Sequence, residues 1–318
     1  MGVPVVVVHG GAGRWSLVFR AAERGGLGIS ESSVRLAVED AAKSGLEVLL
    51  DGGSPVRAAA EAVRRLEDSG LFNAGLGSSI DAAGGISMDA GVMSGEGPRA
   101  GAVVAVRRPR NPVLLALYVM METPHVIMCC EWADTISARI GLDPHPGPGK
   151  RALTLRKFLL EELRDEYGSL LEAAKRLGLA LGDTVGAVAV DGEGRVGVAV
   201  STGGTSLKLP GRVGDSPVPG AGFYALNGLG GAVVTGKGEH ALLSLPALRA
   251  VEGMRSASPG VAGRLALDHV RRLTGGRLGM ILASPAGRVA AVFTTEAMPW
   301  AVARPGKTVS GLWEPYDE

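Results

Sequence analysis

The stretch from Gly182 to Ala189 (GDTVGAVA) constrains this chain most, because a charged helical segment stops there and an apolar strand begins at Thr184. A threonine in the middle of a chain is a weak nucleophile, since its hydroxyl has no neighbouring base. Scission before Thr184 would create an α-amine with a pKa of ~8 next to the residue's own hydroxyl, so that one residue supplies both nucleophile and base. The alternative is an ordinary strand start, because β-branched residues favour strands and the preceding Asp183 favours a turn.

Composition and charge exclude several classes of protein. With 318 residues, 46% of them hydrophobic and 20% charged, the chain is typical of a compact soluble protein with a large core. The 33 Lys and Arg residues balance the 32 Asp and Glu residues, so no broad basic surface for nucleic acid or acidic lipid is expected. Neither a signal peptide nor a transmembrane segment is visible, and the adjacent Cys129 and Cys130 are poor disulfide partners. We therefore expect a cytoplasmic protein without nucleic-acid or membrane partners.

The first half of the chain mixes strand and helix patterns. An apolar run at 5–8 predicts a buried strand that ends in the turn HGGAG. His9 is interpreted as a turn residue, or as one that supports a site from behind, rather than as a metal ligand, because it has no HxH or HExxH partner. A dinucleotide-binding start is weakly supported, since 14–28 shows no clean helical pattern. Apolar spacing predicts helices at 32–50, 54–66, 112–121 and 131–140 and strands at 85–93 and 101–106. This order indicates layers of α and β rather than strict βαβ alternation.

The segment before Thr184 is suited to scission. Residues 143–150 are rich in Pro and Gly and indicate a linker, and 150–177 has the apolar spacing of an amphipathic helix. We expect much of the region 141–182 to be peripheral and mobile. A peripheral segment is where a cut can leave a free end without disrupting a core.

The second half begins with a hairpin. Apolar runs at 185–190 and 196–200 flank a turn at 191–194, and the second run leads into Ser201-Thr202-Gly203-Gly204. Paired residues in a hairpin lie about 5 Å apart. Thr202, near the end of the second strand, is therefore expected to face Thr184.

Two glycine-rich turns carry groups that suit an amino-acid ligand. In LPGRVGDSP, Arg212 can donate to a carboxylate and Asp215 can accept from an ammonium, the two ends of a zwitterion. A surface ion pair on a loop is an equally good interpretation of these two residues alone. In TGKGE, which starts at Thr235, backbone N–H groups ahead of a helix could bind a developing oxyanion.

Taken together, these motifs resemble the plant-type L-asparaginase and isoaspartyl peptidase family of N-terminal-nucleophile hydrolases. The resemblance covers nearly the whole chain, and although each motif is weak alone, their order and spacing are specific. The segments that carry it are HGGAG (His9–Gly13), LFNAG (Leu71–Gly75), NP (Asn111), TPHV (Thr123–Val126), TVGAVA (Thr184–Ala189), STGG (Ser201–Gly204), LPGRVGDSP (Leu209–Pro217) and TGxGE (Thr235–Glu239).

The resemblance implies an α+β fold, a four-layer αββα sandwich, with residues 1–318 as a single domain. It also implies self-cleavage between Asp183 and Thr184, which yields an alpha fragment, 1–183, and a beta fragment, 184–318. Two copies of each fragment would form the active particle, a dimer of cleaved heterodimers.

The resemblance also implies roles for single residues. The implied catalytic residues are the nucleophile Thr184, Thr202 that orients it, Thr235 and the amide of Gly236 as the oxyanion hole, and Asn73 near the nucleophile. Arg212 and Asp215, with Thr235, Gly236 and Gly238 nearby, would bind the substrate. No cofactor is implied beyond a structural sodium ion, bound by main-chain carbonyls of Leu66, Glu67, Ser69, Phe72, Ala74 and Leu76.

The implied reaction is hydrolysis of L-asparagine to L-aspartate and ammonia and of isoaspartyl (β-aspartyl) dipeptides. One departure concerns the branch: plain members commonly have Gly before the nucleophile, whereas Asp183 stands here, as in glycosylasparaginase and the threonine endopeptidases. An N4-glycosyl-asparagine amidase is therefore an alternative, and a non-catalytic ligand-binding scaffold is another. HGGAG and LFNAG favour the asparaginase branch, 141–182 leaves no room for a long specificity insertion, and a lysosomal glycoprotein enzyme would need a signal peptide.

Overall fold

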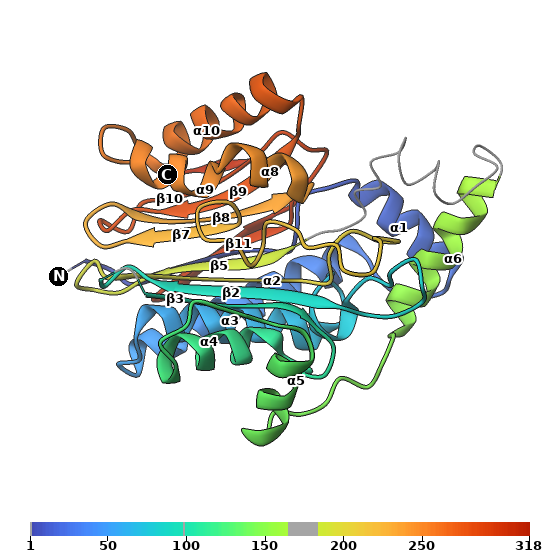
Figure 1. Cartoon of the computed structure of the whole chain (residues 1–318). Helices are drawn as coiled ribbons and strands as arrows, with labels where there is room; N and C mark the ends of the chain where they lie inside the picture. Colours follow the sequence, from blue (N-terminus) through green and yellow to red (C-terminus); the bar gives the residue numbers. More distant parts are fainter. Residues whose placement is uncertain (1, 98, 165–183) are drawn as a thin grey trace.

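The computed structural model describes residues 2–97, 99–164 and 184–318, which form two stacked β-sheets between layers of helices (Figure 1). Neighbouring strands of the larger sheet are antiparallel except for its last pair. From edge to edge this sheet contains β12 (Lys307–Gly311), β11 (Trp300–Arg304), β1 (Val5–His9), β5 (Val185–Val190), β6 (Val196–Thr202), β2 (Met88–Ser94), β3 (Arg99–Val106) and β4 (Ile127–Cys129). The smaller sheet contains β13 (Tyr316–Asp317), β10 (Val289–Phe293), β9 (Leu278–Ala283), β8 (Gly230–Gly236) and β7 (Phe223–Leu226).

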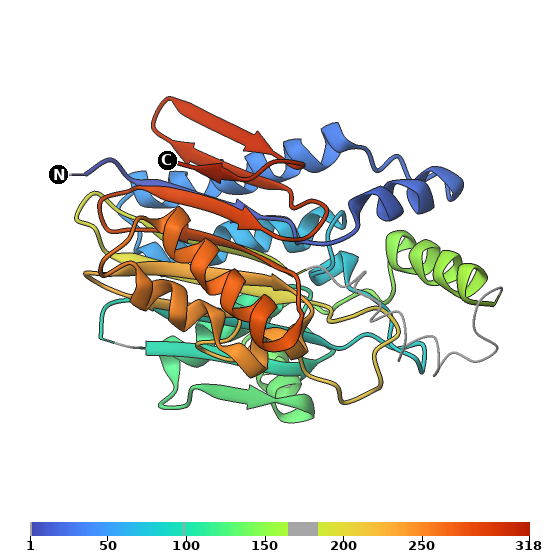
Figure 2. The same ribbon diagram turned by 90° about the horizontal axis from the view of Figure 1, so that it is seen from above.

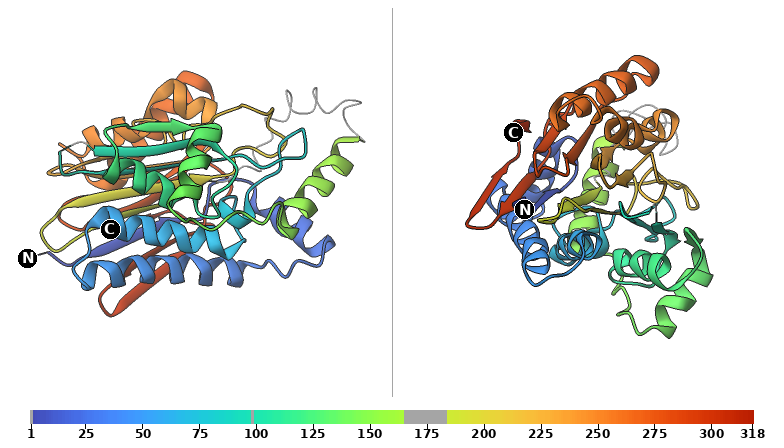
Figure 3. Two further views of the ribbon diagram at one scale, coloured as in Figure 1. Left: turned by 60° about the horizontal axis from the view of Figure 1, so that its bottom comes forward. Right: turned by 90° about the vertical axis from the view of Figure 1, so that its left-hand side faces the viewer.

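Helices cover the outer face of each sheet (Figures 1 and 2). The larger sheet is covered by α2 (Glu31–Leu50), α3 (Pro55–Ser69) and α4 (Pro112–Glu122), and the smaller one by α8 (Gly238–Ser244), α9 (Pro246–Gly253) and α10 (Pro259–Thr274). At one end of the molecule α1 (Trp15–Arg24) lies beside α6 (Lys150–Arg164), and α5 (Cys130–Arg139) follows β4. Figure 3 shows the two sheets enclosed between the helical layers. The predicted α+β sandwich is confirmed.

The strands separate the hydrophobic core into layers because successive side chains point to opposite faces. In β1, Val6 and Val8 face the helices of the larger sheet, whereas Val5 and Val7 face the smaller sheet. A third cluster joins the smaller sheet to α9 and α10. The continuous apolar run predicted at 5–8 is therefore buried on both sides.

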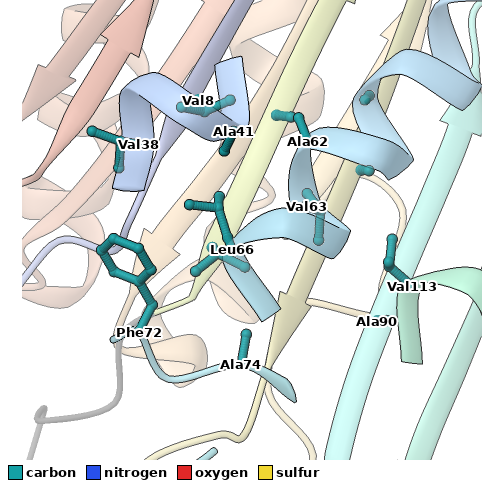
Figure 4. Packing of buried hydrophobic residues seen from close by; sticks show 14 of the residues in the cluster. Val8, Val38, Ala41, Ala62, Val63, Leu66, Phe72, Ala74, Ala90 and Val113 are labelled. Atoms are coloured by element: carbon teal, nitrogen blue, oxygen red, sulfur yellow. The ribbon is translucent and has the colours of Figure 1, made fainter. Parts of the chain in front are cut away.

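Small side chains let the helices lie close to the larger sheet. Figure 4 shows Ala41 and Ala62 from α2 and α3 beside Val8, with Leu66 and Phe72 below them. Each of these side chains is fully buried. Close packing of this kind leaves few voids and fixes the strands that carry the candidate site.

The expectation for 14–28 was wrong, because α1 is a helix of ten residues in this segment. Trp15, Val18 and Ala22 line its buried face, and the Trp15 indole donates to the carbonyl of Gly11 at 3.0 Å. A helix of nearly three turns offers few repeats of the apolar spacing, and the charged residues between the apolar ones obscure the pattern. The helix starts directly after the HGGAG turn and therefore fixes that turn.

The region around the expected scission site is described only in part. The helix predicted at 150–177 is present over Lys150–Arg164 as α6, where Leu155, Phe158 and Leu159 are buried and α1 packs alongside, and its second part, 165–177, lies outside the described residues. The described part is thus peripheral in position but firmly packed. Residues 165–183, including Asp183, lie outside the described residues, so the predicted mobility of 141–182 is untested there.

Within the described part of the chain, no helix combines the length and apolar character needed to cross a membrane.

Candidate active site

Polar side chains replace the valines at one end of the space between the two sheets. In β5, Val188 and Val190 face the smaller sheet, and the two-residue period places Thr184 on the same face. Val185 pairs with Ser201, so Thr184 lies opposite Thr202, which follows the inward-facing valines of β6. The structure therefore brings the two threonines together, as the hairpin spacing predicts.

A small cavity of about 10 Å³ lies at this position, with room for roughly one water molecule. It gathers the residue before β5, the end of β6, the loop after β6, the end of β8 and the start of α8. The lining residues are Thr184, Thr202, Gly204, Thr205, Arg212, Gly214, Asp215, Ser216, Gly236 and Gly238. Six predicted site residues are among them, whereas Thr235 and Asn73 are not.

Thr235 nevertheless contacts the predicted nucleophile directly. Its Oγ1 accepts hydrogen bonds from the backbone nitrogens of Thr184, at 3.2 Å, and Ala12, at 3.1 Å. A hydroxyl has two acceptor positions and one donor. Two backbone N–H groups occupy both acceptor positions of the Thr235 oxygen. The Thr235 O–H can therefore donate a hydrogen bond to a third group, such as a substrate.

Ser216 is a site residue that sequence reasoning missed. Its Oγ lies 3.2 Å from Oγ1 of Thr184, and the side chain is buried. The sequence could have indicated Ser216, because it directly follows Asp215 in the GDSP segment and belongs to the same turn. The amide of Ala12, in the HGGAG turn, was missed in the same way.

Asn73 does not line the cavity but hydrogen-bonds to the turn that does. Its Nδ2 donates to the carbonyl of Gly204 at 2.7 Å, and its Oδ1 accepts from the amide of Ser79 at 2.7 Å. The amide of Gly203 donates to the Asn73 carbonyl at 2.9 Å. Asn73 thus connects the LFNAG loop to the STGG turn, and both polar ends of its side chain already have hydrogen-bond partners.

Arg212 and Asp215 form the charged side of the cavity. Arg212 donates from Nε and Nη2 to the Glu239 carboxylate at 3.0 and 3.1 Å. The surface ion pair considered for Arg212 and Asp215 is therefore not formed, because Arg212 pairs with Glu239 and Asp215 is buried. Gly238 lies against both cavity residues, because a Cβ there would approach Nη2 of Arg212 to 2.8 Å and Oδ1 of Asp215 to 2.9 Å. The absence of a side chain at Gly238 is what allows this close approach.

Asp215 is buried, and one of its carboxyl oxygens lacks a hydrogen-bond partner among the described residues. Among the residues that the structure describes, none makes a hydrogen bond to its Oδ2. Burial raises the pKa of Asp215 to about 7, although the charge of Arg212 opposes the rise. A cationic ligand would restore the ionised form, because an opposite charge favours a carboxylate.

His9 lies at the end of β1 on the same inter-sheet face, paired with Gly186. Burial lowers the pKa of His9 to about 3, against a smaller opposing effect of the Thr184 backbone. The imidazole is therefore neutral at ordinary pH. His9 therefore belongs to the strand rather than to the turn, and its ring lies beside the Thr184 backbone, where it can support the site from behind.

No cluster of three or more His, Cys, Asp or Glu side chains suited to a metal ion occurs in residues 2–97, 99–164 and 184–318. The predicted sodium loop would use main-chain carbonyls instead. It runs from the end of α3 into η1 (Gly75–Gly77). The carbonyl of Leu66 already accepts from the Ser69 hydroxyl, and that of Phe72 from the Ala74 amide.

Comparison with known proteins gives a consistent result. The profile of a family described as Asparaginase matches residues 2–310. The chain is 41% identical over 316 residues to the plant-type L-asparaginase of Pyrobaculum calidifontis, covering 96% of this chain and 99% of that protein. It is 39% identical over 310 residues to the isoaspartyl peptidase/L-asparaginase of Bos taurus and 38% identical over 310 residues to that of Homo sapiens, covering 97% of this chain and 96% of each relative.

Proposed function

Since the chain belongs to the asparaginase family, we propose that it is a self-processing amidohydrolase that converts L-asparagine to L-aspartate and ammonia and hydrolyses β-aspartyl dipeptides. The observation that carries this proposal is the surrounding of Thr184. Its nitrogen and its hydroxyl both have hydroxyl partners, Thr235 and Ser216, in a cavity that also holds Arg212 and Asp215. A nucleophile with its own amine as base and a zwitterion site are the parts that this reaction needs.

The first chemical event is scission of the bond between Asp183 and Thr184, which divides the chain into 1–183 and 184–318. The Thr184 nitrogen then becomes an α-amine whose neutral form can accept a proton. The uncut chain offers a cavity of only about 10 Å³, which is too small for asparagine. Scission is therefore proposed both to create the base and to open the site.

In the cleaved protein, Oγ1 of Thr184 attacks the side-chain carbonyl carbon of the substrate while the α-amine takes the hydroxyl proton. The carbonyl oxygen becomes an oxyanion, which the free O–H of Thr235 and the amide of Gly236 stabilise. Collapse of this intermediate breaks the C–N bond, and the ammonium of Thr184 gives its proton to the leaving nitrogen. A β-aspartyl ester remains, and water releases aspartate by the reverse sequence.

Substrate recognition uses the two ends of the amino acid. Arg212 donates hydrogen bonds to the α-carboxylate, and Oδ2 of Asp215 accepts a hydrogen bond from the α-ammonium. Gly238 keeps the two side chains close to each other. Oγ1 of Thr202 accepts a hydrogen bond from the amide of Gly204 at 3.0 Å, and Thr202 lies opposite Thr184 at the end of the hairpin.

The remaining proposals concern the whole particle. We expect a dimer of cleaved heterodimers in the cytoplasm, with small molecules as substrates. A structural sodium ion fits the loop from Leu66 to Leu76 only through second lone pairs at Leu66 and Phe72, because these carbonyls already accept hydrogen bonds. No step of the reaction depends on it.

The glycosylasparaginase alternative is kept because Asp183, rather than Gly, precedes the nucleophile. Ammonia or amine release from asparagine, β-aspartyl-leucine and N4-(N-acetylglucosaminyl)-asparagine, measured side by side, separates the two. Turnover of the first two substrates supports the proposal. Turnover of the glycosylated substrate alone would replace it, and a full-length chain that releases no ammonia after prolonged incubation would indicate a scaffold.

A further inference from the structure

Glu239 holds one edge of the Arg212 guanidinium, and the reaction above assigns this carboxylate no role. Its Oε1 accepts a hydrogen bond from Nε of Arg212 at 3.0 Å, and its Oε2 accepts one from Nη2 at 3.1 Å. Both contacts lie along the side edge of a planar group, and such bidentate pairs add geometric specificity to the attraction of the charges. The pair therefore fixes the rotation of the guanidinium as well as its position.

The pair connects two loops that both contribute to the cavity. Arg212 belongs to the turn LPGRVGDSP, and Glu239 stands in the first turn of α8, directly after the cavity residue Gly238. The Arg212 side chain is only 18% exposed, whereas that of Glu239 is 49% exposed. A surface pair with this exposure adds little stability. Its place between the two loops suggests a role in the site instead.

The end edge of the guanidinium, formed by Nη1 and Nη2, lies against the cavity. A Cβ on Gly214 would approach Nη1 to 2.8 Å, and a Cβ on Gly238 would approach Nη2 to 2.8 Å. Both glycines line the cavity together with Arg212. The pair with Glu239 leaves both N–H groups of Nη1 and one of Nη2 for another acceptor. The end edge can thus bind a second carboxylate while Glu239 keeps the side edge.

We propose that Glu239 is a positioning residue, which orients Arg212 so that Nη1 and Nη2 receive the α-carboxylate of the substrate. This inference rests on the proposed function. Glu239 contacts Arg212 rather than the substrate in this arrangement, so its effect passes through Arg212. The substrate can bind without displacing Glu239, because the two carboxylates use different edges of one guanidinium.

Two other roles predict different results when the Glu239 carboxylate is removed. If this carboxylate competed with the substrate carboxylate for Arg212, its removal would lower KM. Loss of a negative charge near the site would act in the same direction, because it favours an anionic group. If the pair were only a surface contact, KM would not change. An orienting role predicts a rise in KM.

The test uses Glu239→Ala and Glu239→Gln in the cleaved protein, with asparagine and β-aspartyl-leucine as substrates. Glu239→Ala frees the guanidinium to rotate, so KM is expected to rise about tenfold while kcat stays within about threefold. Glu239→Gln keeps one acceptor oxygen and should raise KM less than Glu239→Ala does. The rise in each variant should be equal for both substrates, because they share the α-carboxylate.

A matched control is Glu252→Ala. The Glu252 carboxylate accepts hydrogen bonds from Nε of Arg255 at 2.7 Å and from Nη2 at 3.5 Å, and its side chain is 44% exposed. This pair resembles that of Glu239, but neither of its residues lines the cavity. Glu252→Ala should leave KM unchanged. If Glu239→Ala behaves like this control, lowers KM, or raises KM for one substrate only, the proposal is wrong.

A second background tests whether the effect passes through Arg212. Lysine has a single ammonium in place of the planar fork, so a carboxylate cannot fix its rotation. In an Arg212→Lys protein, adding Glu239→Ala should change kcat/KM, measured at low substrate concentration, by less than about twofold. A further loss of about tenfold would show that Glu239 acts elsewhere and would overturn the proposal.

Two further measurements keep the test decisive. If Glu239→Ala does not give folded, cleaved protein, Glu239→Gln carries the test by the same criteria. Calorimetric titration of cleaved protein with L-aspartate reads affinity without turnover, and unchanged affinity in the variants would contradict the role of Glu239. If the wild type binds aspartate but releases no ammonia from asparagine, the proposed function fails, whereas weaker aspartate binding in the variants still supports the role of Glu239.

Discussion

Thr235 is the residue whose hydroxyl proton the proposed reaction needs most. Its oxygen accepts the nitrogens of Thr184 and Ala12, which fixes the direction of the remaining O–H. Thr235→Val keeps the shape and removes the donor, so kcat for asparagine is expected to fall about 10²-fold or more. Thr235→Ser keeps the donor and should retain most activity. Steady-state ammonia release measures both, and equal activity of the two variants would exclude the role.

Ser216 holds the nucleophile hydroxyl before attack. Without its Oγ, the Thr184 side chain loses a partner at 3.2 Å and gains rotational freedom. Ser216→Ala is therefore expected to lower kcat about tenfold with little change in KM. Ser79→Ala is the control, since Ser79 is also buried and pairs with the hydroxyl of Ser206 outside the cavity. If Ser79→Ala lowers kcat as much as Ser216→Ala does, the effect comes from lost packing rather than from the contact to Thr184.

Asp215 predicts a pH dependence of substrate binding. Its pKa is raised by burial to about 7, so the carboxyl is neutral below that pH and cannot pair with the substrate ammonium. KM for asparagine should be about tenfold higher at pH 6 than at pH 8. Thr235→Val should show the same pH curve for KM, because it leaves Asp215 intact. A flat KM between pH 6 and 8 in wild type would remove Asp215 from ammonium binding.

At the scale of elements, the LFNAG loop and the STGG turn depend on Asn73. Asn73→Ala leaves the carbonyl of Gly204 and the amide of Ser79 buried without partners, which costs about 3 kcal/mol of unfolding free energy. Denaturant unfolding should show this loss together with reduced activity. Asn111→Ala, which removes a part-buried contact to Asp68 at 3.2 Å and a contact to Glu67, should cost less than Asn73→Ala, about 1 kcal/mol. Activity loss in Asn73→Ala without a stability change would instead place Asn73 in the chemistry.

Elements with a clear local pattern were predictable from the sequence. The hairpin of β5 and β6 follows from two apolar runs around a short turn, and α2 follows from apolar spacing over 20 residues. The segment from Gly238 to Gly253 forms two helices, α8 and α9, because Pro246 cannot continue the first one and Leu245 adopts a left-handed φ of 50°. The strands β11 and β12 were missed, because nothing local shows that they complete a sheet begun at residue 5.

The site was predictable where residues are close in sequence and less so where strands pair across the fold. Thr184 and Thr202 meet through one hairpin, so their spacing predicts the contact. Asp89 reaches Thr202 only because β2 is inserted beside β6, and Ala12 reaches Thr235 across the gap between the two sheets. Such contacts depend on long-range pairing, which no local pattern of residues contains.

At the scale of the whole molecule, three buried layers hold the site at the end of the inter-sheet core. Thr184 directly precedes the central strand β5, which is flanked by β1 and β6. Scission there would leave the described sandwich intact. This arrangement lets an internal residue become a rigid amino terminus.

The most direct test is amino-terminal sequencing of the purified, active protein, together with Thr184→Ala. Wild-type protein should show a second amino terminus that reads Thr-Val-Gly-Ala. Thr184→Ala should stay full length and release no ammonia from asparagine. Wild-type protein that turns over asparagine without this new terminus, or a Thr184→Ala variant with normal turnover, would contradict it.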